Sequence, residues 1–175
     1  MNLSLYSQEV VLRDGRPALI RAIRPDDKQR LSEGFHHLSS QSIYQRFFTR
    51  KKDLSDNELK KLTEVDFNHH VAIVAELDHK GKKDDIGVGR YIELKDNGPE
   101  RAAGIAITVD DEHQGLGVGT LLFQHLVVLA RNHGISRLVA DVLLNNKSML
   151  TIIKHSGFKL ETSTGYGVVH IEFNI

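Results

Sequence analysis

Residues 114–119 read Gln-Gly-Leu-Gly-Val-Gly, and this hexapeptide constrains the fold more than any other feature of the chain. It follows an apolar run with strand character at 105–109 and precedes an amphipathic helical pattern that begins near Val118. Such a turn exposes the first N–H groups of the helix, which have no partner within the helix and lie at the positive end of its dipole. Glycines reach positive φ and let an anion approach the backbone closely. The hexapeptide therefore predicts a strand, a phosphate-binding turn and a helix in succession.

Two other glycine-rich phosphate motifs fit this hexapeptide poorly. A nucleotide-hydrolase loop ends in Gly-Lys-Ser/Thr, whereas this chain continues Thr-Leu-Leu at 120–122. A dinucleotide-binding fingerprint usually opens its domain, whereas this hexapeptide lies past the middle of the chain. On the glycines alone, a strand-to-helix turn without a ligand stays open as an alternative.

Composition sets the class of protein. With 175 residues, of which 40% are hydrophobic and 26% charged, we expect one globular domain over 1–175. Basic and acidic residues number 23 each, so no overall field favours nucleic acid or a membrane, and neither is expected as a partner. The absence of cysteine excludes disulfides, thiolate catalysis and cysteine-ligated zinc. Because no signal-like N-terminus or membrane-length apolar run is present, a cytoplasmic location is expected.

Turn and capping signals give the order of elements. Asp14-Gly15 between two apolar runs predicts an N-terminal hairpin over about 8–23. Ser55 and Glu58 form a capping box for one helix, and Asn145-Asn146 caps a later one. The predicted helices cover 25–37, 42–48, 55–63, 118–133 and 145–156, and the later strands cover 71–77, 86–94, 101–109, 137–142, 158–160 and 167–173, with polar turns at 79–85 and 96–99. This order predicts a mixed sheet with helices on both faces, in the α/β or α+β class.

The hexapeptide matches the Gln/Arg-x-x-Gly-x-Gly/Ala signature of the GNAT superfamily of acyl-coenzyme A-dependent N-acetyltransferases. A later segment, from Asn146 to Gly157-Phe158, resembles a second stretch of that family. The segments 19–27, 42–48 and 62–66 look like the acetyltransferase domain of bacterial protein-lysine acetyltransferases, whose usual fusion partners are not expected within 175 residues. The resemblance covers nearly the whole chain. It implies a single GNAT-like domain with a mostly antiparallel sheet that is splayed between the family's fourth and fifth strands.

The resemblance also implies a co-substrate, acetyl-CoA. The amides of 114–120 would cradle its pyrophosphate, and free backbone groups of Ile107 and Val109 would hold its pantetheine arm. The coenzyme-binding residues implied in this way are Ile107, Thr108, Val109, Gln114, Gly115, Leu116, Gly117, Val118, Gly119, Thr120, Asn146 and Met149.

The match fails at the usual catalytic positions. Attack on a thioester requires a neutral amine, and at pH 7 only on the order of 1 in 10³ free lysines is neutral. The acetyltransferases that the chain resembles use a glutamate on the strand before the signature as general base, and here Gly104, beside Ala103, takes that position. The tyrosine that many members use to protonate the leaving thiolate corresponds to Ile153.

Two residues are predicted as substitutes. Glu93, near the end of the neighbouring strand, would approach the cleft as the base, although a solvated strand-end carboxylate is the simpler interpretation. Tyr166, in the turn of the closing hairpin, would serve as the acid or only in packing. Asp111 and Glu112 are interpreted as structural parts of the approach to the loop.

The histidines and the basic run give weaker signals. None of the ten histidines follows a metal-binding pattern, and no metal is expected, because the adjacent pairs at 36–37 and 69–70 direct their rings apart. His113, when protonated, would add positive charge beside a pyrophosphate. Arg-Lys-Lys at 50–52 is interpreted as a solvated face, with contact to a ribose phosphate or an acidic substrate as the alternative.

The predicted function is transfer of an acetyl group from acetyl-CoA to a primary amine, either a protein lysine or a small mono-amine, by direct attack on the thioester. The acceptor is expected between 43–48 and 163–168, where no carboxylate cluster of the sort that selects a polyamine is present. A homodimer is left open. The rival interpretation, raised by Gly104 and Ile153, is an acyl-CoA-binding or sensing module without turnover.

Overall fold

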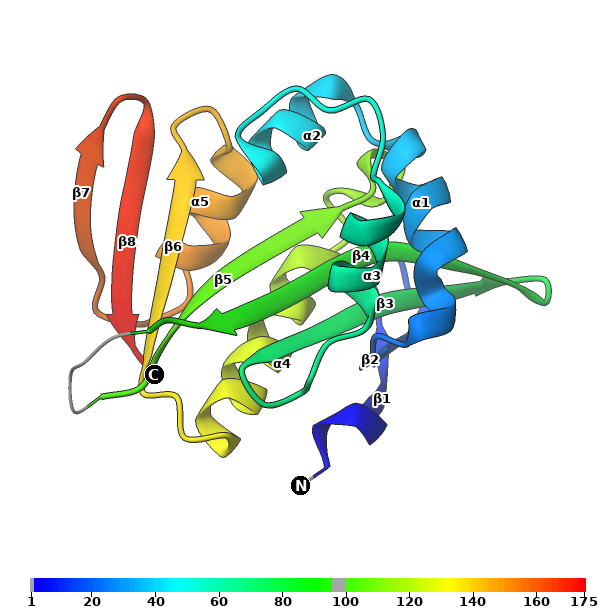
Figure 1. The fold of residues 1–175 in the computed structure, drawn as a ribbon, viewed down its shortest axis with the longest axis horizontal. Coiled ribbons are helices and arrows are strands. Elements are labelled where there is room, and N and C mark those ends of the chain that lie inside the picture. The colour runs from blue at the N-terminus through cyan, green and yellow to red at the C-terminus, as the bar shows by residue number, and fades with distance from the viewer. Residues whose placement is uncertain (1, 96–99) are drawn as a thin grey trace.

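In the computed structural model, which describes residues 2–95 and 100–175, an eight-stranded sheet runs in the order β1-β2-β3-β4-β5-β6-β8-β7 (Figure 1). Its strands are β1 (Ser7–Val11), β2 (Pro17–Ala22), β3 (His70–His79), β4 (Lys82–Glu93), β5 (Ala102–Val109), β6 (Arg137–Leu143), β7 (Glu161–Gly165) and β8 (Val168–Asn174). The helices are α1 (Lys28–His37), α2 (Ser40–Phe47), α3 (Asp56–Thr63), α4 (Val118–Asn132) and α5 (Lys147–Lys154), with short 3-10 turns at Leu3–Leu5, Pro25–Asp27 and Asp111–His113.

The sheet divides where β5 meets β6. Every other neighbouring pair of strands is antiparallel, whereas β5 and β6 are parallel and pair over Ala102 to Gly104 only. Beyond Gly104 the two strands diverge towards the end of the sheet where α2 lies (Figure 1). This confirms the expected α/β fold with a mostly antiparallel, splayed sheet.

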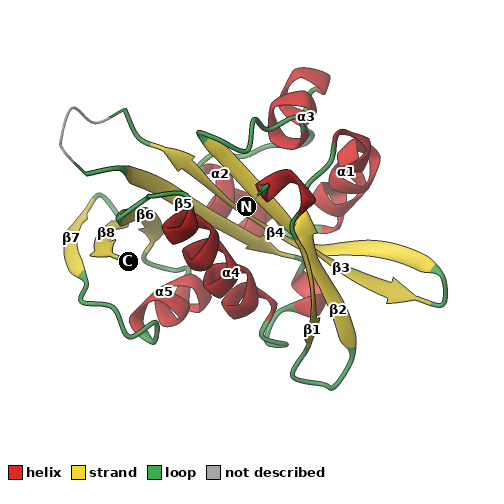
Figure 2. Ribbon diagram, turned by 90° about the horizontal axis from the view of Figure 1, so that it is seen from below, coloured by secondary structure: helices red, strands yellow, loops and turns green. Residues whose placement is uncertain are grey.

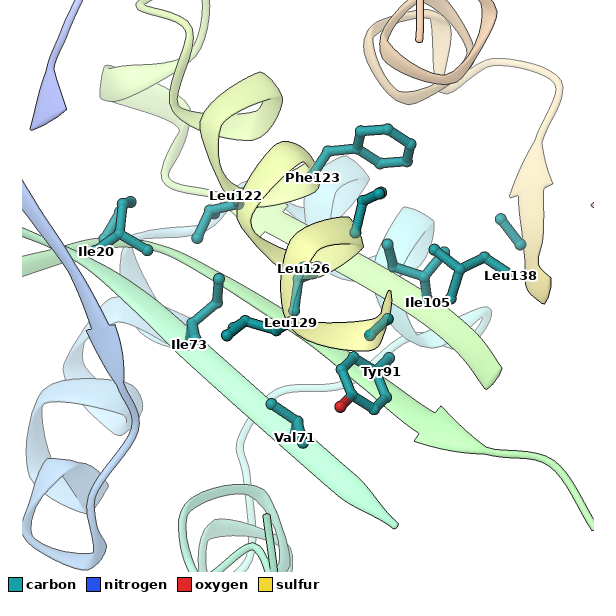
Figure 3. Packing of buried hydrophobic residues seen from close by; sticks show 14 of the residues in the cluster. Ile20, Val71, Ile73, Tyr91, Ile105, Leu122, Phe123, Leu126, Leu129 and Leu138 are labelled. Carbon is teal, nitrogen blue, oxygen red and sulfur yellow. The ribbon is translucent and has the colours of Figure 1, made fainter. Parts of the chain in front are cut away.

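Helices cover both faces of the sheet, with α1, α2 and α3 on one face and α4 and α5 on the other (Figure 2). The main core lies under α4, whose Leu122, Leu126 and Leu129 are fully buried and face Ile73 of β3 (Figure 3). This close approach depends on Gly89 of β4, because a Cβ there would lie 2.8 Å from a methyl carbon of Leu126. The α4 helix, and with it the glycine loop, is therefore fixed firmly to the sheet.

A buried ion-pair network fixes the start of α1 to the opposite face. Arg21, which is 1% exposed, donates two hydrogen bonds to Asp27 (2.8 and 2.9 Å) and one to Glu76 (2.9 Å). Since Asp27 precedes α1 while the other two residues lie on β2 and β3, these bonds join the helix to the sheet. Charges this deeply buried are stable only when they are paired and hydrogen-bonded, as here.

Two predicted boundaries are wrong. The predicted turn at 79–85 shrinks to Lys80 and Gly81, both at positive φ, because the polar flanking residues continue β3 and β4 as an exposed hairpin. The first strand of the closing hairpin is Glu161–Gly165 rather than 158–160, because Phe158 stacks on Phe173 in the core while β7 is an exposed edge strand without an apolar pattern. The predicted turn at 96–99 lies outside the described residues.

The capping box is confirmed, since the Ser55 side chain accepts from the amide of Glu58 and the Glu58 side chain accepts from the amide of Ser55. In the part of the chain that the structure describes, every helix is too short or too polar to cross a bilayer.

Candidate active site

The glycine loop presents an open helix N-terminus, as the hexapeptide predicts. Between the end of β5 and the start of α4, Gly115 and Gly117 adopt φ angles of +80° and +86°, which other residues rarely adopt. The first main-chain bond of α4 runs from the amide of Leu121 to the carbonyl of Gly117 (3.0 Å). The three preceding amides, of residues 118–120, therefore have no partner within the helix and are available to an anion.

Two segments distant in sequence hold this loop in place. From the β1–β2 turn, Arg13 donates its amide to the carbonyl of Leu116 (3.0 Å) and its guanidinium to the carbonyl of Gly115 (3.3 Å). On the other side, Asp111 accepts from the amide of Ser39 (2.7 Å) and from the hydroxyl of Ser42 (2.7 Å). Asp111 thus ties the N-terminus of α2 to the loop.

The α2 helix also reaches across to the second half of the sheet. The side-chain amide of Gln45 donates to Asn145 (3.5 Å), which lies just before α5. The neighbouring Asn146 is the N-cap of α5, as predicted, because its side chain accepts from the amide of Met149 (3.2 Å). Helix α2 thus spans the diverging strands at the open end of the sheet.

A cavity of about 800 Å³ lies between α2, the end of β5, α4 and α5. All but one of the residues predicted to bind the coenzyme line it, namely Ile107, Thr108, Val109, Gln114, Gly115, Gly117, Val118, Gly119, Thr120, Asn146 and Met149. Leu116 is the exception, since its side chain packs against the core. The structure therefore brings three separate sequence segments together around one space.

The cavity is cationic. Its lining includes the cationic side chains Arg13, Arg46, Arg131 and Lys147, together with His113 and His155, and among the described residues that line it there is no carboxylate. A cavity with guanidinium groups and free helix amides but no acidic side chain suits a ligand with several phosphates.

Sequence reasoning missed most of these basic groups. For Arg131 a signal was present, because Thr120, Gln124, Val127 and Arg131 recur at helical spacing along α4 and all line the cavity. For Arg13 no signal was present, because its contact with Gly115 joins residues 102 positions apart.

Glu93 does not line the cavity. It pairs with Ala103, six residues along β5 from Val109, which corresponds to roughly 20 Å of strand. Its carboxylate is occupied, with two bonds from Arg101 (2.7 and 2.9 Å) and one contact with His69 (2.8 Å). Hydrogen bonds from Arg101 and His69 lower the pKa of Glu93 to about 2. The structure thus places Glu93 in an ion-pair cluster at the far end of the strand.

Tyr166 is also outside the cavity. It lies at the tip of the β7–β8 hairpin with φ of +52° and a fully exposed side chain. Ile153, at the family's tyrosine position, is fully buried in the core. At the family's glutamate position, Gly104 leaves open space, since a Cβ there would meet only a methyl carbon of Leu94 within 3.7 Å and a carbonyl oxygen at 3.9 Å.

The two segments expected to border the acceptor differ in their placement. Helix α2 borders the cavity through Ser42, Gln45 and Arg46, while its Tyr44 is 43% exposed. The hairpin segment at 163–168 does not line the cavity.

Of the histidine pairs at 36–37 and 69–70, His113 and the basic run at 50–52, only His113 lies in the cavity lining, where its ring contacts Asp110 (2.7 Å). Lys51, from the basic run, pairs with Glu58 (2.7 Å), away from the cavity. In the described parts of the chain, no three His, Asp or Glu side chains are arranged to hold a metal ion.

Comparisons with known proteins agree with this geometry. The family model described as the acetyltransferase (GNAT) family matches residues 36–158. An acetyltransferase of Pseudomonas aeruginosa is 30% identical over 147 residues, which cover 84% of this chain and 77% of that protein. The acetyltransferase Pat of Mycolicibacterium smegmatis is 32% identical over 148 residues, which cover 85% of this chain but 43% of Pat, so this chain spans less than half the length of Pat.

Solved structures show the same fold. The GNAT domain of the S. lividans protein PAT superposes with a TM-score of 0.86 at 34% identity, with 97% of each chain covered. The protein yncA of Salmonella typhimurium, solved with its cofactor acetyl-CoA, superposes with a TM-score of 0.70 over 90% of this chain and 92% of that one. At 17% identity, this second likeness concerns the fold alone.

Proposed function

Because the chain belongs to the GNAT family of acetyltransferases, we propose that it transfers the acetyl group of acetyl-CoA to a protein lysine or a small mono-amine. The observation that carries this proposal is the cationic cavity, whose described lining has no carboxylate and which opens onto the N-terminus of α4 at the split in the sheet. Coenzyme A fits this combination, because its pyrophosphate is joined to a long amide-containing arm that ends in the thiol.

Different groups of the cavity would bind different parts of the coenzyme. The amides of 118–120 would receive the pyrophosphate, and Arg13 and Arg131 would add positive charge beside it. Past Gly104, β5 has no strand partner on its β6 side, so main-chain groups of Ile107 and Val109 on that edge would hold the arm. The carbonyl of Val109 accepts from the side-chain amide of Gln114 (3.3 Å), which the arm would displace or share. The thioester would then lie deep in the split, where an amine can attack it from the face opposite α4.

The preference for a lysine or mono-amine as the acceptor rests on the residues that line the cavity and on the relatives of the protein. The described lining has no acidic side chain that would select a polyamine, and α2, which borders the cavity, carries the partly exposed aromatic Tyr44. The resemblance of the sequence to bacterial protein-lysine acetyltransferases, together with the likeness to the GNAT domain of PAT, supports a lysine side chain as the acceptor.

One experiment separates this proposal from the rival, a sensing module without turnover. The purified protein is titrated with acetyl-CoA by calorimetry and then assayed for release of coenzyme A thiol with a panel of amines, lysine peptides and proteins. We expect both binding and turnover. Tight binding without turnover would favour the sensing module, and failure to bind acetyl-CoA would refute both.

Acceptor identity needs a second measurement. Labelled acetyl-CoA is incubated with the protein and a cell lysate, and the labelled species are identified. Label on protein lysines or mono-amines supports the proposal, whereas label confined to polyamines contradicts the acceptor preference.

A further inference from the structure

The open space at Gly104 faces a particular part of the sheet. Gly104 on β5, Val139 on β6 and Glu172 on β8 are paired in one row across the three strands. Directly paired residues point to the same face, so Glu172 shares the face on which the family's glutamate would lie. The neighbouring residues Ile105 and Leu138 point to the other face, where they are buried with α4.

A chain of hydrogen bonds occupies this face beside Gly104. The Oδ1 of Asp141 contacts the Nδ1 of His170 (2.6 Å), and the Nε2 of the same ring contacts the Oε1 of Glu172 (2.9 Å). The second oxygen of Glu172 accepts from Arg137 (2.8 Å). Asp141 and Arg137 are the two ends of this hydrogen-bond network. The side chain of Asp141 is 58% exposed, whereas that of Arg137 is 29% exposed. The network therefore fixes the position of the exposed carboxylate of Asp141.

Asp141 lies at the start of the split, which is the region where β5 and β6 diverge beyond Gly104. The pair formed by Gly104 and Val139 is the last one that joins β5 to β6, and Asp141 lies two residues farther along β6, where the strands have separated. From sheet dimensions, its Cα lies roughly 8 Å from that of Gly104. The cavity lining on β5 extends from Val109 to Ile107, and neither Gly104 nor Asp141 belongs to it. A pantetheine arm that enters beside Val109 and continues along β5 past Ile107 would bring its thioester towards Asp141.

We propose that Asp141 is the proton acceptor for the incoming amine, and that His170 and Glu172 are positioning residues that hold its carboxylate at the split. This inference rests on the proposed function. The ammonium group of the acceptor gives one proton to Asp141, and the neutral nitrogen forms a bond to the thioester carbon. As the C–S bond breaks, the sulfur takes the electron pair and is protonated by the second proton of the nitrogen. The proton on Asp141 returns to water, so one acetyl group is transferred and one proton is released.

Asp141 is a better candidate for the acceptor of this proton than His170. The hydrogen bonds that the ring of His170 makes to the carboxylates of Glu172 and Asp141 raise the pKa of His170, which favours its charged form. Both ring nitrogens are already used in the chain, so neither is presented to a substrate.

The remaining charged groups around this face are few. Arg137 is bound to Glu172, and Glu161 of β7 lies opposite Glu172 without a place in the hydrogen-bond chain. On β4, Arg90 turns its guanidinium towards His70 and the carbonyl of Leu62. On α2, which covers the same face, Arg46 lines the cavity with its guanidinium 5.0 Å from the ring centroid of Phe47. No charged side chain of β5 lies on this face within its described residues.

The test compares wild type with Asp141→Asn over a range of pH. With a lysine peptide at pH 7, we expect kcat to fall by about 10²-fold, the low end of the usual contribution of a general base, while the KM for acetyl-CoA is unchanged. The loss should shrink to below about tenfold near pH 10, where much of the lysine is already neutral. It should shrink in the same way at pH 7 with a primary amine of low pKa. A purely structural role would give a loss that does not depend on the pKa of the amine.

Matched variants complete the test. His170→Gln should reduce kcat less than Asp141→Asn does, and Glu161→Gln, on the same face, should leave kcat within about twofold, far below the effect of a lost base. Adding Gly104→Glu to Asp141→Asn should restore activity, because that position is open and lies on the same face. If wild type is active and Asp141→Asn equals it at pH 7, or if the loss of kcat is constant with pH, the role of Asp141 is refuted while the proposed function stands. If wild type binds acetyl-CoA but acetylates nothing, the proposed function fails as well.

Discussion

At the scale of single residues, Asp85 is the buried carboxylate that the fold compensates least. Its side chain is 3% exposed, and it lies 3.4 Å from Arg30 and 3.6 Å from Arg21, yet neither of its oxygens accepts a hydrogen bond in the structure. Burial raises the pKa of Asp85 to about 6 in spite of the two arginines. For this residue the cost of desolvation therefore exceeds the gain from its ion pairs.

The sign of the pH dependence follows. A carboxyl group with a higher pKa in the folded than in the unfolded state binds its proton more tightly when folded, so its contribution to stability grows as pH falls from about 7 towards 5. We expect Asp85→Asn to be more stable than wild type at pH 7, by on the order of 1 kcal/mol, and this difference to shrink by pH 5. Thermal unfolding at both pH values measures this difference in stability. The control is Asp84→Asn, which removes the neighbouring and more exposed carboxylate. A variant less stable than wild type at pH 7 would mean that the ion pairs to Arg21 and Arg30 dominate.

At the scale of elements, the glycine loop and α4 act as one unit, and this can be tested by charge. Thr120 lies in the first turn of α4 and lines the cavity. An aspartate there interacts favourably with the helix dipole, by about 0.3–1 kcal/mol, but repels a pyrophosphate. We expect Thr120→Asp to keep or raise the melting temperature while weakening acetyl-CoA binding by about tenfold or more, equivalent to about 1.4 kcal/mol.

Thr120→Asn is the matched control, since it changes the side chain without adding a charge. If Thr120→Asp bound acetyl-CoA as tightly as wild type, the assignment of the pyrophosphate to this helix end would be wrong. The position is a cleaner probe than Gly119, because a Cβ at Gly119 would lie 2.9 Å from a methyl carbon of Ile152 and so disturb packing as well as binding.

The elements also show what a sequence can predict. Local signals gave correct results, since the capping box at Ser55, the N-cap at Asn146 and the positive φ of Gly117 depend on residues a few positions apart. Edge strands such as β7 were misplaced, because a fully exposed strand has no apolar alternation to detect. The hydrogen-bond chain from Asp141 could not be predicted, because the register between β6 and β8 joins residues 29 positions apart.

At the scale of the whole molecule, the split leaves β6, β7 and β8 joined to the rest of the sheet by one short run of parallel pairing at 102–104. The cavity is lined from both sides of this split, by β5 and α4 on one side and by α5 on the other. A ligand that fills it contacts both parts at once. Binding should therefore stabilise the joint between the parts more than the interior of either one.

Acetyl-CoA at about 100 times its dissociation constant should add about 2.7 kcal/mol to the free energy of unfolding. For a chain of this length, that raises the melting temperature by roughly 5–10 °C. Hydrogen exchange should show the added protection at 107–120 and 146–156, which line the cavity, and little change in β1 and β2, which lie far from the split. Thr120→Asp at the same coenzyme concentration should show a smaller rise. A rise in melting temperature with protection spread evenly over the sheet would contradict binding across the split, because the coenzyme would then stabilise the fold without bridging its two parts.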